Sequence, residues 1–437
     1  MSGVAVHRAV CVDVGSTYTK ACLVDLDGGA LICGTQTPTT ASSDVLTGLD
    51  AAVSALGDTA AGAAGWYVCS SAGGGLRLAV VGYEALVTAE AAHRAGLSAG
   101  ARVVHVAAGP LDAAGLDGLR AARPDVILLA GGTDGGDGSV LLHNARRLAA
   151  ARLRVPVVVA GNAEARPDAA RALAERRVPV TVTGNVLPRI GVFDAGPARA
   201  AVRAVFLEHV IGGKRLSRGR RFASLVRCAT PDAVLAGVEV LADMTGAGVL
   251  VIDVGGATTD VYSALVPDAE RDTGPRRDVA GTAWRSRTVE GDLGVAAGAP
   301  GAVAAARAEN LPVPDLPVPD LPGARRHSGV TDRELAAVAA VVASRRHARG
   351  HRSGPGLPRT GGRDLRDVRL VVGSGGVLRH GGGPAVLAAV LGDTGGGWVP
   401  PQAARRVVDA DYVLAAAGLL AADHPRAAAG LLTRLTE

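Results

Sequence analysis

The spacing of apolar residues over the first 70 positions predicts three strands, one helix and a fourth strand. AVCVDVG (9–15) is a β-branched run that ends in glycine, KACLVDLDGG (20–29) alternates before a turn, and ALICGTQT (30–37) follows. A helix is expected over about 44–56, and WYVCSSAGG (66–74) reads as the next strand. Periodicity alone therefore indicates a mixed α/β fold.

A more regular stretch follows, in which four apolar strands alternate with amphipathic helices rich in Ala and Arg. The predicted strands lie at 102–108, 125–130, 155–160 and 178–183. Apolar strands separated by helices are typical of a parallel sheet that is covered on both faces. We therefore expect a small parallel α/β subdomain over about 98–190, inserted into the first of two lobes.

The second half of the chain predicts another lobe of similar construction. Helices are expected over about 195–211 and 232–244, and the strand GVLVIDVGG (248–256) then opens the second lobe. The tandem repeat LPVPDLPVPDLP (311–322) excludes a helix and a central strand, because proline lacks the backbone N–H that both need for their hydrogen bonds. The domain organisation is therefore predicted as a first lobe over 1–245 and a second lobe over 246–437. The remaining expected elements are a helix at 331–348, a loop at 349–363, a strand within DVRLVVGSGG (367–376), and helices at 384–391 and 408–421.

Composition narrows the classes of function. No run approaches the roughly 20 apolar residues that span a bilayer, and no leader pattern precedes the first strand, so a cytoplasmic protein without membrane attachment is expected. The sequence pI is about 9.2. The basic residues are nearly all scattered arginines, and aromatic residues make up only 3%, which disfavours nucleic-acid binding. The five cysteines form no C-x-x-C pair, which makes an iron–sulfur or zinc site an unfavoured interpretation.

The turn Asp13–Lys20 (DVGSTYTK) has the residues of a phosphate loop. Asp13 at the end of a strand can hold Mg²⁺ through water, and Gly15 lets the backbone approach a phosphate closely. Ser16 and Thr17 offer hydroxyl and amide donors, and Lys20 adds one of the only two lysines in the chain. A single turn of this kind is also compatible with an ordinary tight hairpin.

A second turn of the same design lies some 240 residues later, at Asp253–Asp260 (DVGGATTD). Asp253 again follows an apolar strand, and glycines and hydroxyls again come next. The residues predicted to meet a nucleotide here are Gly255, Gly256, Thr258 and Thr259. Two such turns favour a duplicated architecture in which phosphates are held from both lobes.

A third glycine-rich turn, LVVGSGGVL (370–378), joins a strand to a helix. Gly373, Ser374, Gly375 and Gly376 leave room for an adenosine, with which larger side chains would collide. Turns of this kind are common. This one indicates a nucleotide site only because it follows the two Asp loops in the sequence.

In that order, the three turns resemble the two phosphate loops and the adenosine loop of the actin/Hsp70/sugar-kinase superfamily. More closely, the chain resembles the glutamate mutase accessory family, MutL or GlmL. GSGG stands where that family more often has GTGG. The stretches that carry the resemblance are SSAGGGLRLAVVG (70–82), DVILLAGGTDGG (125–136), VVVAGNAEA (157–165), VIDVGGATTDVYS (251–263), RTVEGDLG (287–294), VVGSGGVL (371–378) and YVLAAAGLL (412–420).

The resemblance implies an actin-like ATPase fold of two ribonuclease-H-like lobes with the inserted parallel α/β subdomain, and ATP with Mg²⁺ as cofactors. It also implies a partner, the subunits of an adenosylcobalamin-dependent glutamate mutase or aminomutase, which a reactivating factor would service by ATP-driven lobe closure. Asp13, Asp253 and Lys20 are then the expected catalytic residues, with Asp13 and Asp253 at the metal. A homo-oligomer is also compatible with the resemblance.

Several alternatives stay open at this point. Glu290, Asp292, Asp134 and Asp137 are acids in glycine-rich turns, where each could position a water or simply cap a turn. His347 matches a family position, although a surface histidine near a helix end is the simpler interpretation. The rival functions are a small-molecule kinase of the same superfamily, an activator of a radical dehydratase, for which the cysteine pattern is unsuitable, and a nucleotide-binding scaffold without turnover.

Overall fold

The computed structural model describes residues 7–60, 62–72, 76–84, 88–98, 101–211, 216–265, 285–312, 329–352, 359–360 and 362–437. These residues form two compact units. The first contains the described chain up to Gly237 together with Ala415–Leu431, and the second contains the described residues of 238–414 and the last six residues. The division falls inside helix α8 (Thr230–Thr245), ahead of the single boundary expected after residue 245.

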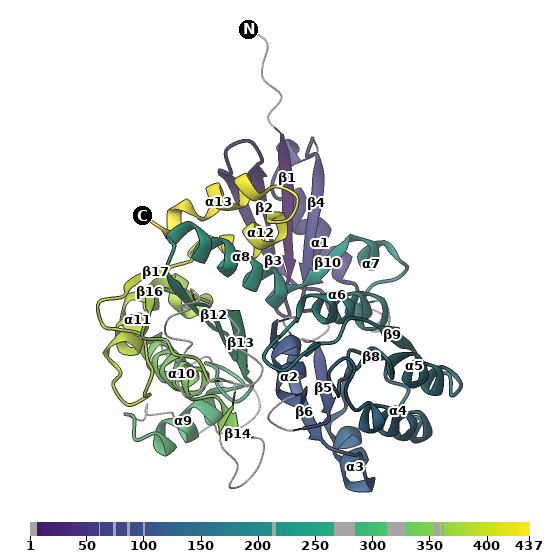
Figure 1. The fold of residues 1–437 in the computed structure, drawn as a ribbon. Helices are drawn as coiled ribbons and strands as arrows, with labels where there is room; N and C mark the ends of the chain where they lie inside the picture. The colour runs from purple at the N-terminus through teal and green to yellow at the C-terminus, as the bar shows by residue number, and fades with distance from the viewer. Residues whose placement is uncertain are drawn as a thin grey trace. The chain divides into compact units, whose positions relative to one another are not determined.

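The first unit contains a five-stranded mixed sheet with the order β10-β4-β1-β2-β3 (Figure 1). The first three strands form an antiparallel meander, and β4 and β10 lie parallel to β1. Helix α1 (Val45–Ser54) begins at the N-cap Asp44, whose side chain accepts from the amide of Leu46. The strands are β1 (Arg8–Val14), β2 (Tyr18–Asp25), β3 (Leu31–Pro38), β4 (Gly65–Ser70) and β10 (Val226–Ala229).

A second sheet in the same unit is wholly parallel, with the order β6-β5-β7-β8-β9. Its strands are β5 (Arg77–Gly82), β6 (Arg102–Ala108), β7 (Val126–Leu129), β8 (Val157–Val159) and β9 (Val180–Val182). Helices α2 (Thr88–Ser98) and α6 (Gly196–Val205) contact one face, and α3 (Ala113–Ala122), α4 (Ser139–Ala151) and α5 (Arg166–Ala174) contact the other. The predicted parallel α/β subdomain is present, and it also includes β5, which precedes the expected start near residue 98.

The second unit is built on a sheet of the same topology as the first, with the order β13-β12-β11-β16-β17. Its first three strands are again antiparallel, and β16 and β17 are again parallel to the central strand β11. The strands are β11 (Gly248–Val254), β12 (Thr259–Ala264), β13 (Arg285–Glu290), β16 (Val368–Ser374) and β17 (Arg405–Val408). Helices α9 (Ala299–Ala308), α10 (Gly329–Arg349) and α11 (Gly383–Gly392) pack with the sheet around one apolar core.

The remaining elements complete these two units. Helix α8 follows β10, and its backbone at Ala233 lies close enough to Gly418 of α12 that a side chain there would clash. Helix α13 lies beside the β2–β3 turn, where Gly29 meets the backbone of Ala427 (Figure 1). These elements are α7 (Arg221–Leu225), β14 (His351–Arg352), β15 (Arg359–Thr360), α12 (Val413–Leu420) and α13 (Pro425–Leu432), with a π-helical turn at Phe206–Ile211.

The strand order third-second-first-fourth-fifth, with an antiparallel meander and two parallel strands, is that of a ribonuclease-H-like fold. Its presence in both units, with a parallel α/β subdomain between β4 and β10, defines an actin-like ATPase fold. The predicted fold class is therefore confirmed. The proline repeat at 311–322 lies almost entirely outside the described residues. Across the described part of the chain, none of the helices combines the length and the apolar character that crossing a membrane requires.

Candidate functional site

Asp13 lies at the end of the central strand of the first sheet, directly before a tight turn. The amide of Gly15 donates to the carbonyl of Tyr18 at 3.1 Å, which closes the β1–β2 hairpin. A Cβ at Gly15 would lie 2.7 Å from that carbonyl oxygen, so only glycine permits this closure. Ser16 and Thr17 are both exposed at the tip of the turn. A tight turn is thus present at the predicted position, with Ser16 and Thr17 exposed.

The two oxygens of the Asp13 carboxylate have different partners. Its Oδ1 accepts from the hydroxyl of Thr230 at 2.5 Å and lies 3.7 Å from the thiol Sγ of Cys69. Burial raises the pKa of the Cys69 thiol well above its ordinary value, which keeps the thiol protonated as a donor. The Oδ2 atom lies 3.9 Å from Nζ of Lys20, its cross-strand neighbour. Sequence reasoning identified Asp13 and Lys20 but missed Thr230 and Cys69.

The second loop repeats this geometry in the other unit. The amide of Gly255 donates to the carbonyl of Thr258 at 2.9 Å, and Asp253 precedes the turn as Asp13 does in the first loop. The carbonyl of Gly256 accepts from the amides of Ala296 and Gly298 at 2.7 and 3.2 Å. The degree of exposure is the same at each position of 11–20 and 251–260 except one. Tyr18 is exposed, whereas Thr258 at the corresponding position is partly buried.

Thr259 differs from its predicted role as a contact for a phosphate. Its side chain is completely buried, and its hydroxyl donates to the carbonyl of Leu293 at 3.0 Å. A hydroxyl that already bonds a backbone carbonyl in the core holds the loop in place. Thr258, one residue earlier, is partly exposed and remains available to a ligand.

The two loops carry opposite charges at corresponding positions. Lys20 stands opposite Asp13, whereas Asp260 stands opposite Asp253 in the same register. The guanidinium of Arg287 donates to Oδ1 of Asp260 through two nitrogens at 3.0 and 2.6 Å, and its side chain is 5% exposed. Because Arg287 neutralises Asp260, the two carboxylates can face each other across the strands. Sequence reasoning did not single out Arg287.

The glycine-rich turn after β16 lies directly beside the second loop. Ser374 is the in-register neighbour of Asp253 across the parallel pair of β11 and β16. Gly375 has φ +100°, and a Cβ there would lie 2.2 Å from the carbonyl oxygen of Val254 and 3.0 Å from Oδ1 of Asp253. Gly376 has nothing within 4 Å of its Cβ position, while Gly373 packs against core leucines. The second and third predicted loops are therefore brought together within one unit.

Taken unit by unit, each loop has groups of the kind that bind part of a magnesium nucleotide. Mg²⁺ commonly binds proteins through one or two carboxylates, while waters and phosphate oxygens complete its octahedron. Asp13 and Asp253 provide a carboxylate each, and within the described ranges no three His, Cys, Asp or Glu side chains group into a site made of protein ligands alone. The exposed turns offer amide and hydroxyl donors of the kind that bind phosphate oxygens. The open space at Gly376 suits a group that lies against the backbone.

The other candidate acids make structural contacts. Arg346 of α10 donates to Glu290 at 2.8 Å and to both oxygens of Asp292 at 2.7 and 3.0 Å. Burial raises the pKa of Glu290, and the ion pair with Arg346 opposes that shift. Asp137 accepts from the amide and hydroxyl of Ser139 at the start of α4, and Asp134 accepts from the amide of Ala163. The contacts of Asp137 and Asp134 support the turn interpretation, whereas Glu290 and Asp292 form ion pairs with Arg346.

His347 is buried, so the surface interpretation of this residue is wrong. Its ring lies between the hydroxyls of Ser263 and Thr288, with Nε2 at 2.8 Å from the first and Nδ1 at 3.0 Å from the second. Burial lowers the pKa of His347 to about 3, with a smaller contribution from Arg363. The helix end carries His347 into the core because α10 continues to Arg349 and packs against β12 and β13.

The buried His347 makes stability depend on pH. The unfolded chain takes up the proton at the ordinary pKa of 6.5, whereas the folded chain does so only near 3, so stability falls as pH drops below 6.5. We expect a loss of roughly 2 kcal/mol between about pH 7.5 and about pH 5. His347→Gln keeps hydrogen-bonding groups but cannot titrate, so its denaturant-unfolding curves should lose this part of the pH dependence. An unchanged dependence in the variant would assign it to other groups.

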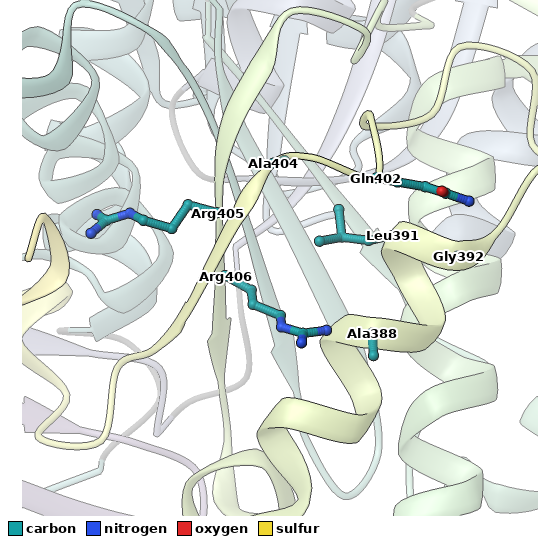
Figure 2. Close-up of a pocket in the computed structure, with 7 residues that line it drawn as sticks. All are labelled: Ala388, Leu391, Gly392, Gln402, Ala404, Arg405 and Arg406. Atoms are coloured by element: carbon teal, nitrogen blue, oxygen red, sulfur yellow. The ribbon is translucent and has the colours of Figure 1, made fainter.

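A cavity of about 600 Å³ lies elsewhere in the second unit, beside β17 and the end of α11 (Figure 2). Figure 2 shows Arg406 reaching toward Ala388, while Arg405 points away from it. Arg405 donates to the carbonyl of Leu435 at 2.6 Å. The residues that line the cavity are Ala388, Leu391, Gly392, Gln402, Ala404, Arg405 and Arg406. None of the predicted site residues lines this cavity, which therefore plays no part in the candidate nucleotide site.

The sequence is similar to known proteins over nearly its whole length. The family model described as MutL protein matches residues 9–435. Protein MutL of Clostridium tetanomorphum is 32% identical over 443 residues, which cover 95% of this chain and 96% of that protein.

Similarity to solved structures is weaker. The ATP-dependent caprolactamase of Pseudomonas jessenii is 14% identical, with a TM-score of 0.40 and coverage of 95% of this chain and 71% of that chain. A nucleotide-free acetone carboxylase is also 14% identical, with a TM-score of 0.34, and the match covers 66% of this chain and about half, 48%, of that chain. The fold assignment therefore rests on the strand order within each unit. The match from residue 9 to residue 435, together with a relative of nearly equal length, shows that the chain belongs to the MutL protein family.

Proposed function

We propose that this chain binds one ATP with Mg²⁺ through the phosphate loops at Asp13–Lys20 and Asp253–Asp260. The observation that supports this most is the repetition of one loop geometry after the central strand of each unit's sheet. The bound Mg²⁺ would neutralise phosphate charge. In this proposal Asp13 and Asp253 orient the waters of that ion, and Lys20 adds a positive charge beside the first loop.

The glycine turn after β16 has a separate role in the proposal. Gly375 and Gly376 would accept the adenosine against their backbone, while Ser374 lies next to Asp253. Gly256 and Thr258 would donate to phosphate oxygens from the second loop, as Ser16 and Thr17 would from the first. Gly15 and Gly255, whose amides close the two hairpins, would let the backbone approach the phosphates closely.

We further propose that the chain is an accessory factor for an adenosylcobalamin-dependent mutase, of which glutamate mutase is the first candidate. Membership of the MutL protein family and the similarity to Protein MutL of Clostridium tetanomorphum support this assignment. Such mutases can retain damaged cobalamin, and ATP-driven closure of the two lobes would help release it and restore activity. A ligand changes a conformational equilibrium only through its different affinities for the two states, so ATP must favour the closed one. The proposed setting is the cytoplasm, with mutase subunits as partners.

A reactivation assay tests this function. The mutase is inactivated during turnover and then supplied with fresh coenzyme, Mg²⁺, ATP and this protein. We expect activity to return only when both the protein and ATP are present. Recovery with ADP or without nucleotide would contradict the role of ATP, and no recovery under any condition would contradict the accessory role. ATP hydrolysis measured in the same samples separates a factor with turnover from a nucleotide-binding scaffold.

A further inference from the structure

Three parallel strands of the first sheet place their ends in one row beside the first phosphate loop. Asp13 of β1 is the register partner of Cys69 on β4, and Cys69 is the register partner of Cys228 on β10. Strand β10 ends at Ala229, and Thr230 begins α8 directly after it. The topology therefore carries Thr230, which is 217 positions away in sequence, to the carboxylate of Asp13.

The start of α8 is fixed by a second contact. Asp232 in its first turn is 2% exposed and forms a salt bridge with Arg203 of α6. Because Asp232 is almost wholly buried, its position depends on that guanidinium. Thr230 is thus attached to a helix whose first turn is tied to a neighbouring helix, and its hydroxyl reaches Asp13 from a defined direction.

The two oxygens of Asp13 consequently differ. Oδ1 accepts from Thr230 at 2.5 Å and lies within reach of the Cys69 thiol at 3.7 Å. Oδ2 lies 3.9 Å from Nζ of Lys20, which is longer than a direct hydrogen bond. An unrestrained carboxylate would rotate and offer either oxygen, whereas this one is held with Oδ2 on the side of Lys20.

We propose that Thr230 is a positioning residue that fixes the rotation of the Asp13 carboxylate, so that Oδ2 is presented to the waters of a bound Mg²⁺. This inference rests on the proposed binding of magnesium ATP. Thr230 acts on the site through the Asp13 carboxylate, which accepts from its hydroxyl. Its loss therefore changes how strongly Mg²⁺ supports nucleotide binding, and it leaves the binding of nucleotide without metal unchanged.

The test compares Thr230→Val, which has nearly the same shape but no hydroxyl, with Thr230→Ser, which restores the hydroxyl. Binding of a fluorescent ATP analogue is titrated against Mg²⁺ concentration for each variant, and again in EDTA. A hydrogen bond to a charged group corresponds to a change of roughly tenfold or more in affinity. We therefore expect Thr230→Val to need about tenfold more Mg²⁺ for half-maximal binding. Thr230→Ser and the wild type should agree within about twofold.

Controls separate positioning from a general structural effect. Thr245→Val removes a hydroxyl at the other end of the same helix, which bonds only backbone carbonyls near its own position, and it should leave the Mg²⁺ dependence unchanged. Thermal unfolding of each variant is measured alongside, and Thr230→Ala replaces Thr230→Val if the valine variant does not fold. Equal Mg²⁺ dependence in Thr230→Val and wild type, or equal weakening with and without Mg²⁺, overturns the inference. Absence of Mg²⁺-dependent binding in the wild type overturns the proposed function itself and is seen before any variant is compared.

Discussion

Replacing Asp13 or Asp253 by asparagine should weaken the binding of magnesium ATP by roughly 100-fold, because each carboxylate contributes charge to the ion. Asparagine keeps the shape of aspartate and an oxygen that can accept from Thr230, so the hairpin should remain folded. Each variant should also lose any ATP hydrolysis that the wild type shows. Equilibrium binding with and without Mg²⁺, together with phosphate release, measures both effects.

Asp27→Asn is the matched control for this experiment. Asp27 is exposed in the turn that joins β2 to β3, which places it at the opposite end of β2 from the phosphate loop. Its replacement changes the net charge by the same amount and should leave ATP binding unchanged. If Asp13→Asn and Asp253→Asn bound magnesium ATP as tightly as Asp27→Asn, the proposed role of the two carboxylates would be wrong.

Gly375→Ala should cost at least about 2 kcal/mol in the free energy of unfolding and should also abolish ATP binding. Two causes act together at this position. The backbone has φ +100°, which side chains rarely adopt, and the new Cβ would lie 2.2 Å from the carbonyl oxygen of Val254. Relief of that clash would push the glycine turn away from the end of β11, where Asp253 lies. Chemical denaturation and nucleotide binding are the two measurements.

Gly376→Ala provides the comparison one residue later. No atom lies within 4 Å of its Cβ position, and this residue begins the helical segment after the turn, where alanine is well tolerated. We expect its stability to match the wild type and its affinity for ATP to fall, because the methyl group would occupy the space proposed for adenosine. Equal stability of Gly375→Ala and Gly376→Ala would contradict the strain described at Gly375.

Much of this fold could be predicted from hydrophobic pattern because the principal strands are apolar and end in glycine. The meander of the first unit, four strands of the parallel sheet, and both Asp loops follow from local sequence alone. The pattern also missed β5, although its sequence RLAVVG is apolar, and three further missed strands carry weaker signals. The strands β10 (VRCA) and β17 (RRVV) are only four residues long and contain arginines. The strand β13 (RSRTVE) contains several charged residues and lies at the edge of its sheet. Only pairing with a neighbouring strand defines them.

The contacts around the site were less predictable because they join residues that lie far apart in sequence. Thr230 precedes a proline at the start of a helix, where a threonine usually reads as a cap, and nothing nearby indicates Asp13. Arg346 and His347 lie side by side in SRRHARG, yet the first pairs with two acids on the β13 side and the second enters the core. Helical periodicity would have placed Arg346 and His347 on different faces of the helix, but only if the end of α10 had been known.

Calorimetric titration of the wild type and of Asp13→Asn and Asp253→Asn with magnesium ATP shows whether the two phosphate loops bind the same nucleotide, since it measures stoichiometry as well as affinity. If the two phosphate loops serve a single nucleotide, the wild type binds one ATP per chain, and either substitution weakens that same event. Two ATP molecules per chain, with one lost in each variant, would mean that each loop binds a nucleotide of its own and would contradict the binding of a single shared ATP.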